Sequence, residues 1–360
     1  MTQPDLVTSP ARITPAWISA ILQANGVDAS VRGLATKIVG TGQIGECVRI
    51  TLDYARTAPG APATLVGKFP SPNPDSRATG VGLGNYLREV RFYQQLAATA
   101  RIRTPRAWYA GIDEASGDFA LIMEDLAPAE QGDQMRGCTL AEAEKVIDEA
   151  AKLHSSHWNN LAIDDLVWVN DTRQAPRVVT QPLVEEIWHG FVARYDEMIT
   201  PFAREVGARF ARNFDAFGAG YVGPKCLVHI DFRPDNMMFG DLDGPSPVAV
   251  VDWQSVTWGC GAADVSYFLA GALPVEVRRA NEKALLQRYH EGMLRLGVAD
   301  HSLDDLWTNY ARYSFNLFMV AFFASMIVKR TERGDRMFFT MLNGAAAHIA
   351  DSDALSLLPP

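Results

Sequence analysis

The sequence predicts an α+β fold with two lobes: an antiparallel five-stranded sheet with one main helix, followed by a larger and mostly helical lobe. Two patterns lead to this prediction. Up to residue 124, apolar and polar residues alternate in short segments, as in strands, whereas from Thr139 onwards apolar residues recur at helical spacing. The 360 residues also exceed the roughly 100–200 of a typical domain. We place the N-terminal lobe at residues 1–124 and the C-terminal lobe at residues 125–360.

The composition argues against some classes of function. With a net charge of −9 and a pI near 5.3, the chain lacks the basic character of nucleic-acid-binding proteins, so we expect no nucleic-acid partner. Its four cysteines, Cys47, Cys138, Cys226 and Cys260, have no spacing suited to zinc. We therefore expect free thiols in a reducing cytoplasm.

The sequence shows no targeting or membrane signal. Its first residues lack the basic start and apolar core of a signal peptide. The longest uncharged run, residues 313–328, is shorter than the roughly 20 residues that a spanning helix needs. We expect a cytoplasmic protein without a membrane span, and the sequence does not indicate its oligomeric state.

The first predicted element is a short helix. Thr14 is a typical N-cap residue, Pro15 suits the first helical position, and an apolar stripe begins at Trp17. Asn25 and Gly26 are expected to end this helix.

A glycine motif follows the first predicted strand, residues 31–39. Gly40, Gly42 and Gly45 form a GxGxxG pattern, which alone is a weak signal and is commoner in dinucleotide-binding folds, where a helix follows. Here residues 47–54 alternate with period two and predict a strand. A glycine hairpin between two strands can fold over phosphates; a plain glycine-rich hairpin is the alternative.

The third predicted strand, residues 64–69, carries Lys68. A lysine within an apolar strand is unusual, because burying an unpaired ammonium group is costly. Either it reaches solvent from an edge strand, or it has a partner. Glu89 lies in an amphipathic helix predicted over residues 83–98 and can supply that partner, which would orient Lys68 toward nucleotide phosphates.

The remaining part of the first lobe leads to an interlobe link. We predict a mobile, proline-rich loop over residues 71–77 and strands over residues 106–112 and 119–123. The last strand runs into an acidic segment that ends in proline, which suits a hinge. Backbone groups near Glu124 and Leu126 are expected to contact the base of a bound nucleotide.

The second half of the chain is predominantly helical in pattern. Thr139 and Glu142 form a capping-box signature at the start of a helix that is expected to reach about Trp158. The further helices that we expect lie at residues 182–199, 201–217, 262–271, 275–296, 303–328 and 336–350.

The stretch that carries the chemistry is residues 226–254. It contains two apolar segments that lead to acidic residues, Asp231 and Asp252, with Asn236 between them and a hairpin turn predicted at residues 241–244. Metal-assisted phosphoryl transfer needs such a set. One acid, Asp231, would orient the attacking hydroxyl, and Asn236 and Asp252 would bind Mg²⁺ through hard oxygens.

Other polar residues near this stretch have two interpretations each. Arg233 can face the transferred phosphate or pair with Asp235. His229 is more typical of a structural histidine that braces the loop than of a base. Asp264 is either an acid that favours a helix N-terminus or a hydrogen-bond acceptor for the backbone of the catalytic loop.

The order of these residues marks a family. His229-x-Asp231, Asn236 and the later Asp252 resemble the aminoglycoside phosphotransferase and choline kinase superfamily, which is related to protein kinases. Four segments look most like its ecdysteroid-kinase-like subgroup: LIMEDL at 121–126, KLHSSHW at 152–158, VDWQ at 251–254 and DVSYF at 264–268. The resemblance covers about residues 30–345.

This resemblance implies a bilobal protein-kinase-like fold and ATP-dependent phosphorylation of a small-molecule hydroxyl with Mg²⁺. It implies that Lys68 contacts the phosphates, that Asp231 is the base, and that Asn236 and Asp252 bind the metal. Two departures from the family stand out. Many relatives have glycine at the position of Ile230, and Asp252 is followed by Trp-Gln instead of the Phe-Gly of protein kinases.

The sequence thus favours an active small-molecule kinase. The alternatives are an aminoglycoside-type antibiotic kinase and a nucleotide-binding pseudokinase, although every charged position that the reaction needs is occupied. A protein kinase is disfavoured, because the segment between Asp252 and Asp264 is too short for peptide docking. No acidic cluster suited to a polycation is evident. We therefore expect an apolar or amphipathic alcohol, with a few aromatic residues of the helical lobe near it; most must form its core. The aromatic residues are Trp158, Trp168, Trp188, Trp258, Trp307, Phe315, Phe318, Phe322 and Phe323.

Overall fold

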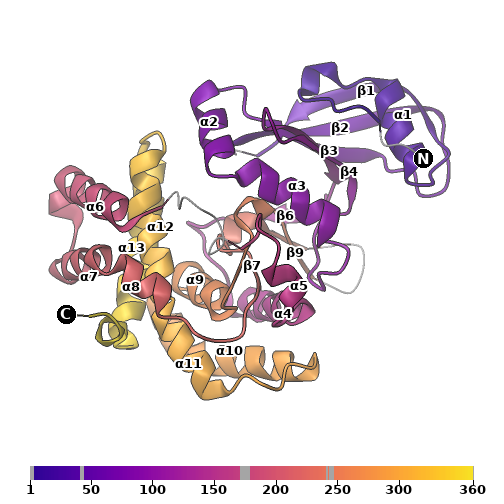
Figure 1. Cartoon of the computed structure of the whole chain (residues 1–360). Coiled ribbons are helices and arrows are strands. Elements are labelled where there is room, and N and C mark those ends of the chain that lie inside the picture. Colours follow the sequence, from indigo (N-terminus) through magenta and orange to yellow (C-terminus); the bar gives the residue numbers. More distant parts are fainter. Residues whose placement is uncertain (1–3, 41–43, 171–178, 241, 243–246, 360) are drawn as a thin grey trace. The chain divides into compact units, whose positions relative to one another are not determined.

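The computed structural model describes residues 4–40, 44–170, 179–240, 242 and 247–359 (Figure 1). The chain forms two compact units. Unit 1 comprises Met1–Thr99, Arg103–Ala129 and Ala249–Val256, and unit 2 comprises Ala100–Ile102, Glu130–Val248 and Thr257–Pro360. The segment that holds Asp252 thus belongs with the N-terminal part of the chain, although it is distant in sequence.

Unit 1 is built on the five-stranded antiparallel sheet that the sequence predicts. Its spatial order is β1-β2-β3-β5-β4, and the neighbouring pairs are antiparallel. The strands are β1 (Ser30–Ile38), β2 (Gly45–Arg56), β3 (Thr64–Pro70), β4 (Ala107–Asp113) and β5 (Asp118–Glu124). This arrangement confirms the α+β fold class.

The helices of unit 1 are η1 (Pro10–Arg12), α1 (Pro15–Ala24), α2 (Pro74–Gly82) and α3 (Asn85–Gln95), and a single turn, η5 (Trp253–Ser255), joins them from later in the chain. Helix α1 begins as predicted, because the Trp17 N–H donates to the Thr14 hydroxyl at 3.2 Å. It ends at Asn25 and Gly26, where glycine adopts a φ of +81° that other residues rarely adopt. Helix α1 packs against β1, and α3 packs against β4 and β5.

The prediction of a loop over residues 71–77 was wrong, because α2 begins there. Asn73 caps this helix: its side-chain oxygen accepts the N–H groups of Asp75 and Ser76, both at 3.0 Å. Pro74 occupies the first helical position, where its missing N–H costs nothing. The proline-rich composition therefore marked a helix start, and α3 is correspondingly shorter than the helix predicted over residues 83–98.

Unit 2 is mostly helical, also as predicted. Its longer helices are α4 (Leu140–Ser156), α6 (Gln181–Tyr195), α7 (Pro201–Arg212), α9 (Ala262–Ala272), α10 (Val275–Arg295), α11 (Leu303–Arg312), α12 (Ser314–Ile327) and α13 (Glu332–Asp351). Shorter ones are α5 (Leu161–Asp164), α8 (Phe214–Ala219), η3 (Asp196–Met198), η4 (Pro234–Asn236) and η6 (Ala354–Leu357). The capping box at the start of α4 is present, with the Thr139 N–H donating to Glu142 at 2.8 Å.

Two of the predicted long helices are divided. The predicted helix over residues 303–328 is α11 and α12 with Tyr313 between them, and the one over residues 201–217 is α7 and α8 with Asn213 between them. Sequence periodicity does not detect such a change of direction, because each half keeps its own apolar stripe.

Short strands in unit 2 frame the catalytic loop. β7 (Cys226–Val228) pairs antiparallel with β10 (Thr257–Gly259), and β6 (Glu130–Gln131) pairs antiparallel with β8 (Met237–Phe239). A further strand, β9 (Val248–Val250), contains the boundary at which the chain passes from unit 2 into unit 1. The hairpin predicted at residues 241–244 falls largely outside the described residues.

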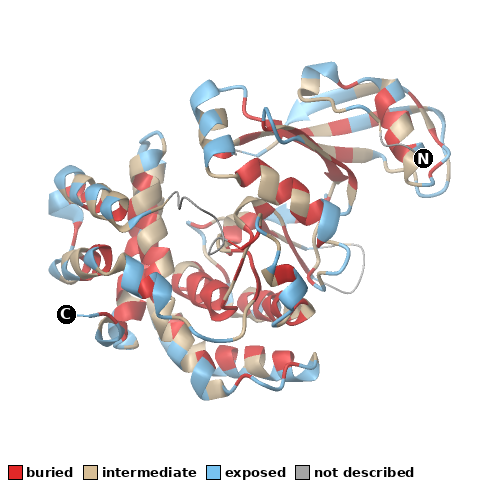
Figure 2. Cartoon of the chain, viewed as in Figure 1, coloured by how far each residue is buried: buried red, intermediate tan, exposed pale blue. Residues whose placement is uncertain are grey.

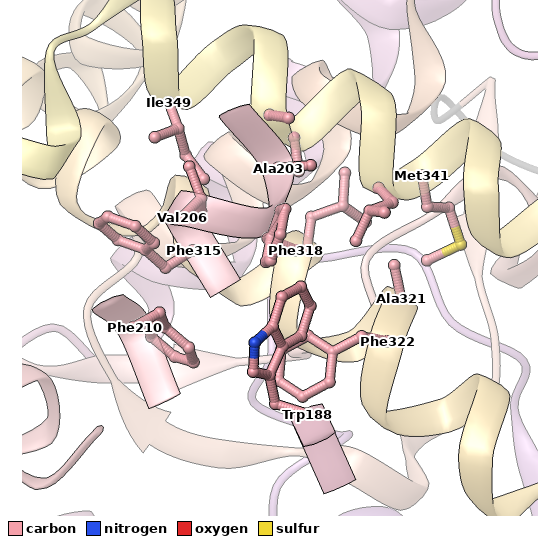
Figure 3. Close-up of a cluster of buried hydrophobic side chains, with 14 of the residues drawn as sticks. Trp188, Ala203, Val206, Phe210, Phe315, Phe318, Ala321, Phe322, Met341 and Ile349 are labelled. Carbon is pink, nitrogen blue, oxygen red and sulfur yellow. The ribbon is translucent and has the colours of Figure 1, made fainter. Parts of the chain in front are cut away.

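An aromatic core joins α6, α7, α12 and α13 within unit 2 (Figures 2 and 3). Trp188 of α6 lies against Phe322 of α12 with ring centroids 5.2 Å apart. A Cβ atom at Gly207 of α7 would come within 2.2 Å of the Trp188 ring, so only glycine allows this approach. Most of the aromatic residues singled out in the sequence, such as Phe315 and Phe318, are core residues and do not line a site.

Helix α12 is apolar around its whole circumference. One face, with Phe315, Phe318 and Phe322, is buried in the aromatic core. Met319 and Phe323 flank this face; they are only partly buried and also pack against the aromatic core. Among the residues that the structure describes, no helix is long and apolar enough to cross a membrane.

Candidate active site

Lys68 of β3 lies between two carboxylates of unit 1. Its Nζ atom is 2.6 Å from Glu89 Oε2 of α3 and 2.8 Å from Asp252 Oδ1. Lys68 and Glu89 are 8% and 1% exposed. The predicted pairing of Lys68 with Glu89 is therefore present, and we call Lys68, Glu89 and Asp252 the lysine cluster.

Burial and charge oppose each other in the lysine cluster. Burial alone would lower the pKa of Lys68, but the neighbouring Asp252 and Glu89 carboxylates outweigh it and hold this pKa well above its usual value. Burial raises the pKa of Glu89, and the Lys68 charge offsets part of that rise. The lysine therefore stays charged, and its two carboxylate partners fix the position of its ammonium group.

The segment around Asp252 is attached to the helix that carries Glu89. Trp253 is fully buried and stacks on Phe92 of α3, with centroids 4.0 Å apart and planes inclined by 10°. Its indole N–H donates to the Thr104 hydroxyl at 2.8 Å. Asn85, at the start of α3, donates to the Gln254 carbonyl at 3.0 Å. Trp253 therefore couples Asp252 to α3, a role that the sequence analysis did not identify.

The glycine motif joins two strands and not a strand and a helix. β1 and β2 form an antiparallel pair in which Ile38 lies opposite Val48. Gly40 adopts a φ of +75°, and a Cβ atom at Gly45 would lie only 3.1 Å from the Phe69 carbonyl oxygen. Gly42 is outside the described residues. The strand after the motif excludes the dinucleotide-binding arrangement, in which a helix would start there.

The link after β5 is held by two ion pairs between arginine and a carboxylate. Arg103 binds Glu124 at 2.6 Å and 3.0 Å, and Arg49 binds Asp125 at 2.6 Å and 3.0 Å. The Glu124 N–H donates to the Arg106 carbonyl at 2.8 Å, and the Leu126 carbonyl accepts the Ala129 N–H at 2.9 Å. Contact of the Glu124–Leu126 backbone with a nucleotide base stays a prediction, and the Glu124 N–H is already engaged.

Asp231 in unit 2 is surrounded by hydrogen-bond donors. The Tyr267 hydroxyl donates to its Oδ1 at 3.1 Å, Asn236 Nδ2 donates to its Oδ2 at 2.8 Å, and Arg233 Nε lies 3.1 Å from Oδ1. We call Asp231, Arg233, Asn236 and Tyr267 the catalytic-loop cluster. Burial would raise the pKa of Asp231, but the Arg233 charge, assisted by His229 and these donors, holds the pKa below its usual value.

Two interpretations of Arg233 were open from the sequence: it faces the transferred phosphate, or it pairs with Asp235. Its guanidinium is 3.1 Å from Asp231 and also 3.2 Å from Asp235. One of its nitrogens lies 3.6 Å from the sulfur of Met337, at the start of α13. The pairing with Asp235 is therefore present, and contact with a phosphate stays a prediction.

Asp264 accepts hydrogen bonds from the backbone of the catalytic loop, which is the second of the two roles that the sequence suggested for it. Its carboxylate accepts the N–H groups of His229 at 2.7 Å and Ile230 at 2.8 Å. His154 of α4 lies 3.2 Å from the same carboxylate and 2.8 Å from the Tyr289 hydroxyl. The sequence analysis gave His154 no role. In the structure, His154 contacts the aspartate that holds the loop.

Ile230 adopts a φ of +70°, the left-handed region in which a β-branched residue is strained. The sequence analysis noted Ile230 as a departure from the glycine of the family that the chain resembles, and the residue adopts a conformation that favours glycine. The bond from the Ile230 N–H to Asp264 helps to hold this conformation. His229 is fully buried, which agrees with a bracing role.

Comparison with known proteins identifies the family. The model of the phosphotransferase enzyme family, APH, matches residues 53–298. The chain belongs to this family and is a small-molecule kinase. Kinases of this family use a nucleoside triphosphate.

Solved structures agree with this fold. A candidate aminoglycoside phosphotransferase from Ralstonia eutropha is 15% identical with a TM-score of 0.55, over 97% of this chain and 100% of that one. Choline kinase LicA from Streptococcus pneumoniae is 12% identical with a TM-score of 0.51, over 91% and 97%. The GDP complex of an aminoglycoside 2'-phosphotransferase-IIIa is 12% identical with a TM-score of 0.50, over 93% and 99%. A search of curated proteins found no match.

Proposed function

We propose that this kinase transfers the γ-phosphoryl group of ATP, with Mg²⁺, to the hydroxyl of an apolar or amphipathic alcohol. The observation that carries the proposal is the pair of clusters on the two units. The lysine cluster provides a buried cation for phosphates, and the catalytic-loop cluster provides an ionised carboxylate, Asp231, for a hydroxyl group.

The proposal gives each residue one task. Lys68 binds phosphate oxygens of the nucleotide, and Glu89 keeps its ammonium group in place. The glycine hairpin with Gly40, Gly42 and Gly45 covers the phosphates. Glu124 and Leu126 border the base.

Asp231 acts on the acceptor in this scheme. It accepts a hydrogen bond from the substrate hydroxyl, aligns it with the γ-phosphorus and takes its proton as the new P–O bond forms and the bond to ADP breaks. Asp231 needs only to be ionised and positioned for this task, and its lowered pKa keeps it ionised at neutral pH. Arg233 offsets negative charge that builds on the phosphoryl group.

The two proposed metal ligands suit Mg²⁺. This ion is bound in kinases by one or two protein oxygens together with substrate phosphates. Asn236 makes both of its bonds to Asp231 through Nδ2, so its amide oxygen is kept for another ligand. The Asp252 side chain is 30% exposed and can supply a carboxylate oxygen. Among the described residues no three His, Cys, Asp or Glu side chains form a metal cluster, which fits an ion held largely by the nucleotide.

The preference for an apolar acceptor is supported by α12 and its surroundings. The partly buried residues of α12 include Met319 and Phe323 and no charged residue. Two acidic residues of unit 2 are already paired: Asp335 with Arg330 at 2.8 Å and Asp133 with Arg333 at 3.3 Å. A polycationic acceptor would need unpaired carboxylates, so these ion pairs favour an uncharged one.

A membership in the ecdysteroid-kinase-like subgroup is part of the proposal. Its support is the set of motifs at residues 121–126, 152–158, 251–254 and 264–268. His154 and Tyr267 from these motifs both contact the catalytic loop or the aspartate that holds it.

An ADP-release assay on a panel of acceptors tests the proposal. The panel contains aliphatic alcohols of increasing chain length, sterols, choline, ethanolamine and kanamycin. We expect turnover with ATP and Mg²⁺ that rises with the apolar area of the alcohol. Turnover of kanamycin alone would refute the proposed acceptor class. ATP binding without turnover of any acceptor would indicate a nucleotide-binding protein that has no kinase activity. Repeating the assay with GTP tests the nucleotide, since GDP is the ligand in the similar aminoglycoside 2'-phosphotransferase structure.

A further inference from the structure

Helix α9 contacts the catalytic loop at two points that lie one turn apart. Asp264, in its first turn, binds the N–H groups of His229 and Ile230. Tyr267, three residues later, donates its hydroxyl proton to Asp231 Oδ1 at 3.1 Å. Residues at i and i+3 share one face of a helix, so both side chains point at the same loop.

We propose that Tyr267 is a positioning residue for the proposed base, holding the Asp231 carboxylate in the orientation that receives the acceptor hydroxyl. The inference rests on the proposed kinase function and adds a residue to its mechanism.

The carboxylate needs such a contact. The terminal torsion of an aspartate side chain has no sharp minima, so the orientation of its two oxygens is set by hydrogen bonds. Asn236 binds Oδ2 and Tyr267 binds Oδ1. A rotation of the carboxylate would break at least one of these two bonds. Arg233 also lies 3.1 Å from Oδ1, but it has a second partner in Asp235, and Asn236 is a proposed metal ligand; the Tyr267 hydroxyl is the contact to which the proposal gives no other task.

Tyr267 is well suited to hold a fixed position. It is 1% exposed, and its ring belongs to the apolar core of unit 2. Burial and the Asp231 charge raise its pKa well above the usual value, so the phenol keeps its proton and donates it to the carboxylate. The ring is anchored by packing and the hydroxyl reaches the loop.

The loop itself is under strain, which makes external support important. Ile230 adopts a left-handed φ that β-branched residues rarely adopt, directly before Asp231. Without its contacts to α9, the backbone at this point would favour another conformation. Asp264 secures the backbone and Tyr267 secures the side chain that follows it.

The test compares Tyr267→Phe with Tyr310→Phe. Tyr310 of α11 is a matched control, because it is 0% exposed and its hydroxyl donates to a carboxylate, Glu282, at 3.2 Å. Both variants lose one buried hydroxyl, so their losses of thermal stability should be similar. We expect kcat to fall about tenfold or more in Tyr267→Phe, as for the loss of one hydrogen bond to a charged group, and by less than twofold in Tyr310→Phe.

Two acceptors are used: water, as Mg·ATP hydrolysis, and the alcohol of the panel that is turned over fastest. The KM for ATP and the affinity for ADP should not change in Tyr267→Phe, because the tyrosine contacts the base and not the lysine cluster. An equal loss of kcat in both variants, or an unchanged kcat in Tyr267→Phe, would overturn the inference while the kinase function stands. A wild-type protein that turns over neither acceptor overturns the proposed function and the inference with it.

Discussion

The lysine cluster of unit 1 and the catalytic-loop cluster of unit 2 stabilise their carboxylates in different ways. Glu89 has one strong partner, the Lys68 ammonium, and burial still raises its pKa. Asp231 has several donors on both oxygens, and its pKa is held below the usual value. Two differences account for the opposite pKa shifts: the Glu89 side chain is only 2% exposed whereas that of Asp231 is 26% exposed, and the Arg233 charge and further donors act on Asp231.

The comparison also separates structural from chemical roles. In unit 1 both carboxylates depend on the same cation, so removing Lys68 leaves Glu89 and Asp252 without it. In unit 2 the carboxylate is held mostly by neutral donors and an arginine that has a second partner, Asp235. We therefore expect substitutions in the lysine cluster to affect stability and nucleotide binding, and substitutions of Asp231 to affect turnover.

The largest expected effect is that of Asp231→Asn. The amide keeps the shape of the side chain but cannot take the hydroxyl proton, so turnover should fall by about 100- to 10,000-fold. Nucleotide affinity should stay within about twofold of the wild type, since Asp231 does not belong to the lysine cluster. ADP release and a nucleotide titration measure the two quantities; turnover within tenfold of the wild type would contradict the role of the base.

Lys68→Met should have the opposite profile. It leaves the buried Glu89 and the partly buried Asp252 without their cation, and breaking a buried ion pair costs about 3–5 kcal/mol of unfolding free energy. Nucleotide binding should be lost as well. Denaturant unfolding measures the first effect, and the exposed Lys145 of α4, changed to Met, is the control. Equal unfolding free energies of the two variants would show that the lysine cluster contributes nothing to stability.

His348 is a third kind of buried titratable group, because among the residues that the structure describes neither of its ring nitrogens has a hydrogen-bond partner. It stacks on Tyr310 with ring centroids 4.2 Å apart. Burial and the positive charge of Arg278 lower its pKa, and the negative charge of Asp351 offsets only part of that effect, so the pKa falls to about 3. The ring is therefore neutral in the folded protein at all ordinary pH values.

The sign of the pH effect follows from this shift. The unfolded chain takes up a proton at His348 below about pH 6.5, while the folded chain does not until about pH 3. Stability from this residue is thus present above pH 6.5 and is lost as the pH falls, by about 1.4 kcal/mol per pH unit. His348→Phe should remove that slope between pH 6.5 and 5.5 in denaturant unfolding. An unchanged slope would mean that the histidine gains a proton in the folded state.

The smallest expected effect concerns the support of Asp252. Thr104→Val keeps the shape of the side chain and removes the hydroxyl that accepts the Trp253 indole N–H, which keeps a second acceptor, the Val250 carbonyl, at 3.2 Å. We expect a loss of about 1 kcal/mol in unfolding free energy. The apparent KM for Mg²⁺ should rise more than the KM for the acceptor. A rise of the acceptor KM alone would argue against the coupling of Asp252 to α3 through Trp253.

Much of this structure follows from local sequence patterns. Short apolar segments identified the five strands of unit 1, with period-two alternation over residues 47–54, and the capping residues Thr14 and Thr139 marked helix starts correctly. Asn73-Pro74 was misread, because the same residues occur in loops and at helix starts, and only the following residues decide between them. The breaks at Asn213 and Tyr313 were missed for a similar reason.

The site divides in the same way. Lys68 could be identified because a charged residue within an apolar strand is costly, and Glu89 followed as its possible partner on a helix. Asp231 and Asp252 could be identified because each follows an apolar segment. Trp253 and Tyr267 could not be, since a buried aromatic residue is the ordinary content of a core and its polar atom shows its partner only in three dimensions.

The sequence by itself determined the fold class, the order of the chemical groups along the chain and the class of reaction, because these depend on local periodicity and on residues that are costly to bury. The tertiary structure decided which groups meet: that Asp252 packs with α3, that Asp264 and Tyr267 of α9 hold the catalytic loop, and that Ile230 adopts a glycine-like conformation. Contacts between residues far apart in the chain depend on the packing of whole helices, and no local pattern encodes that packing.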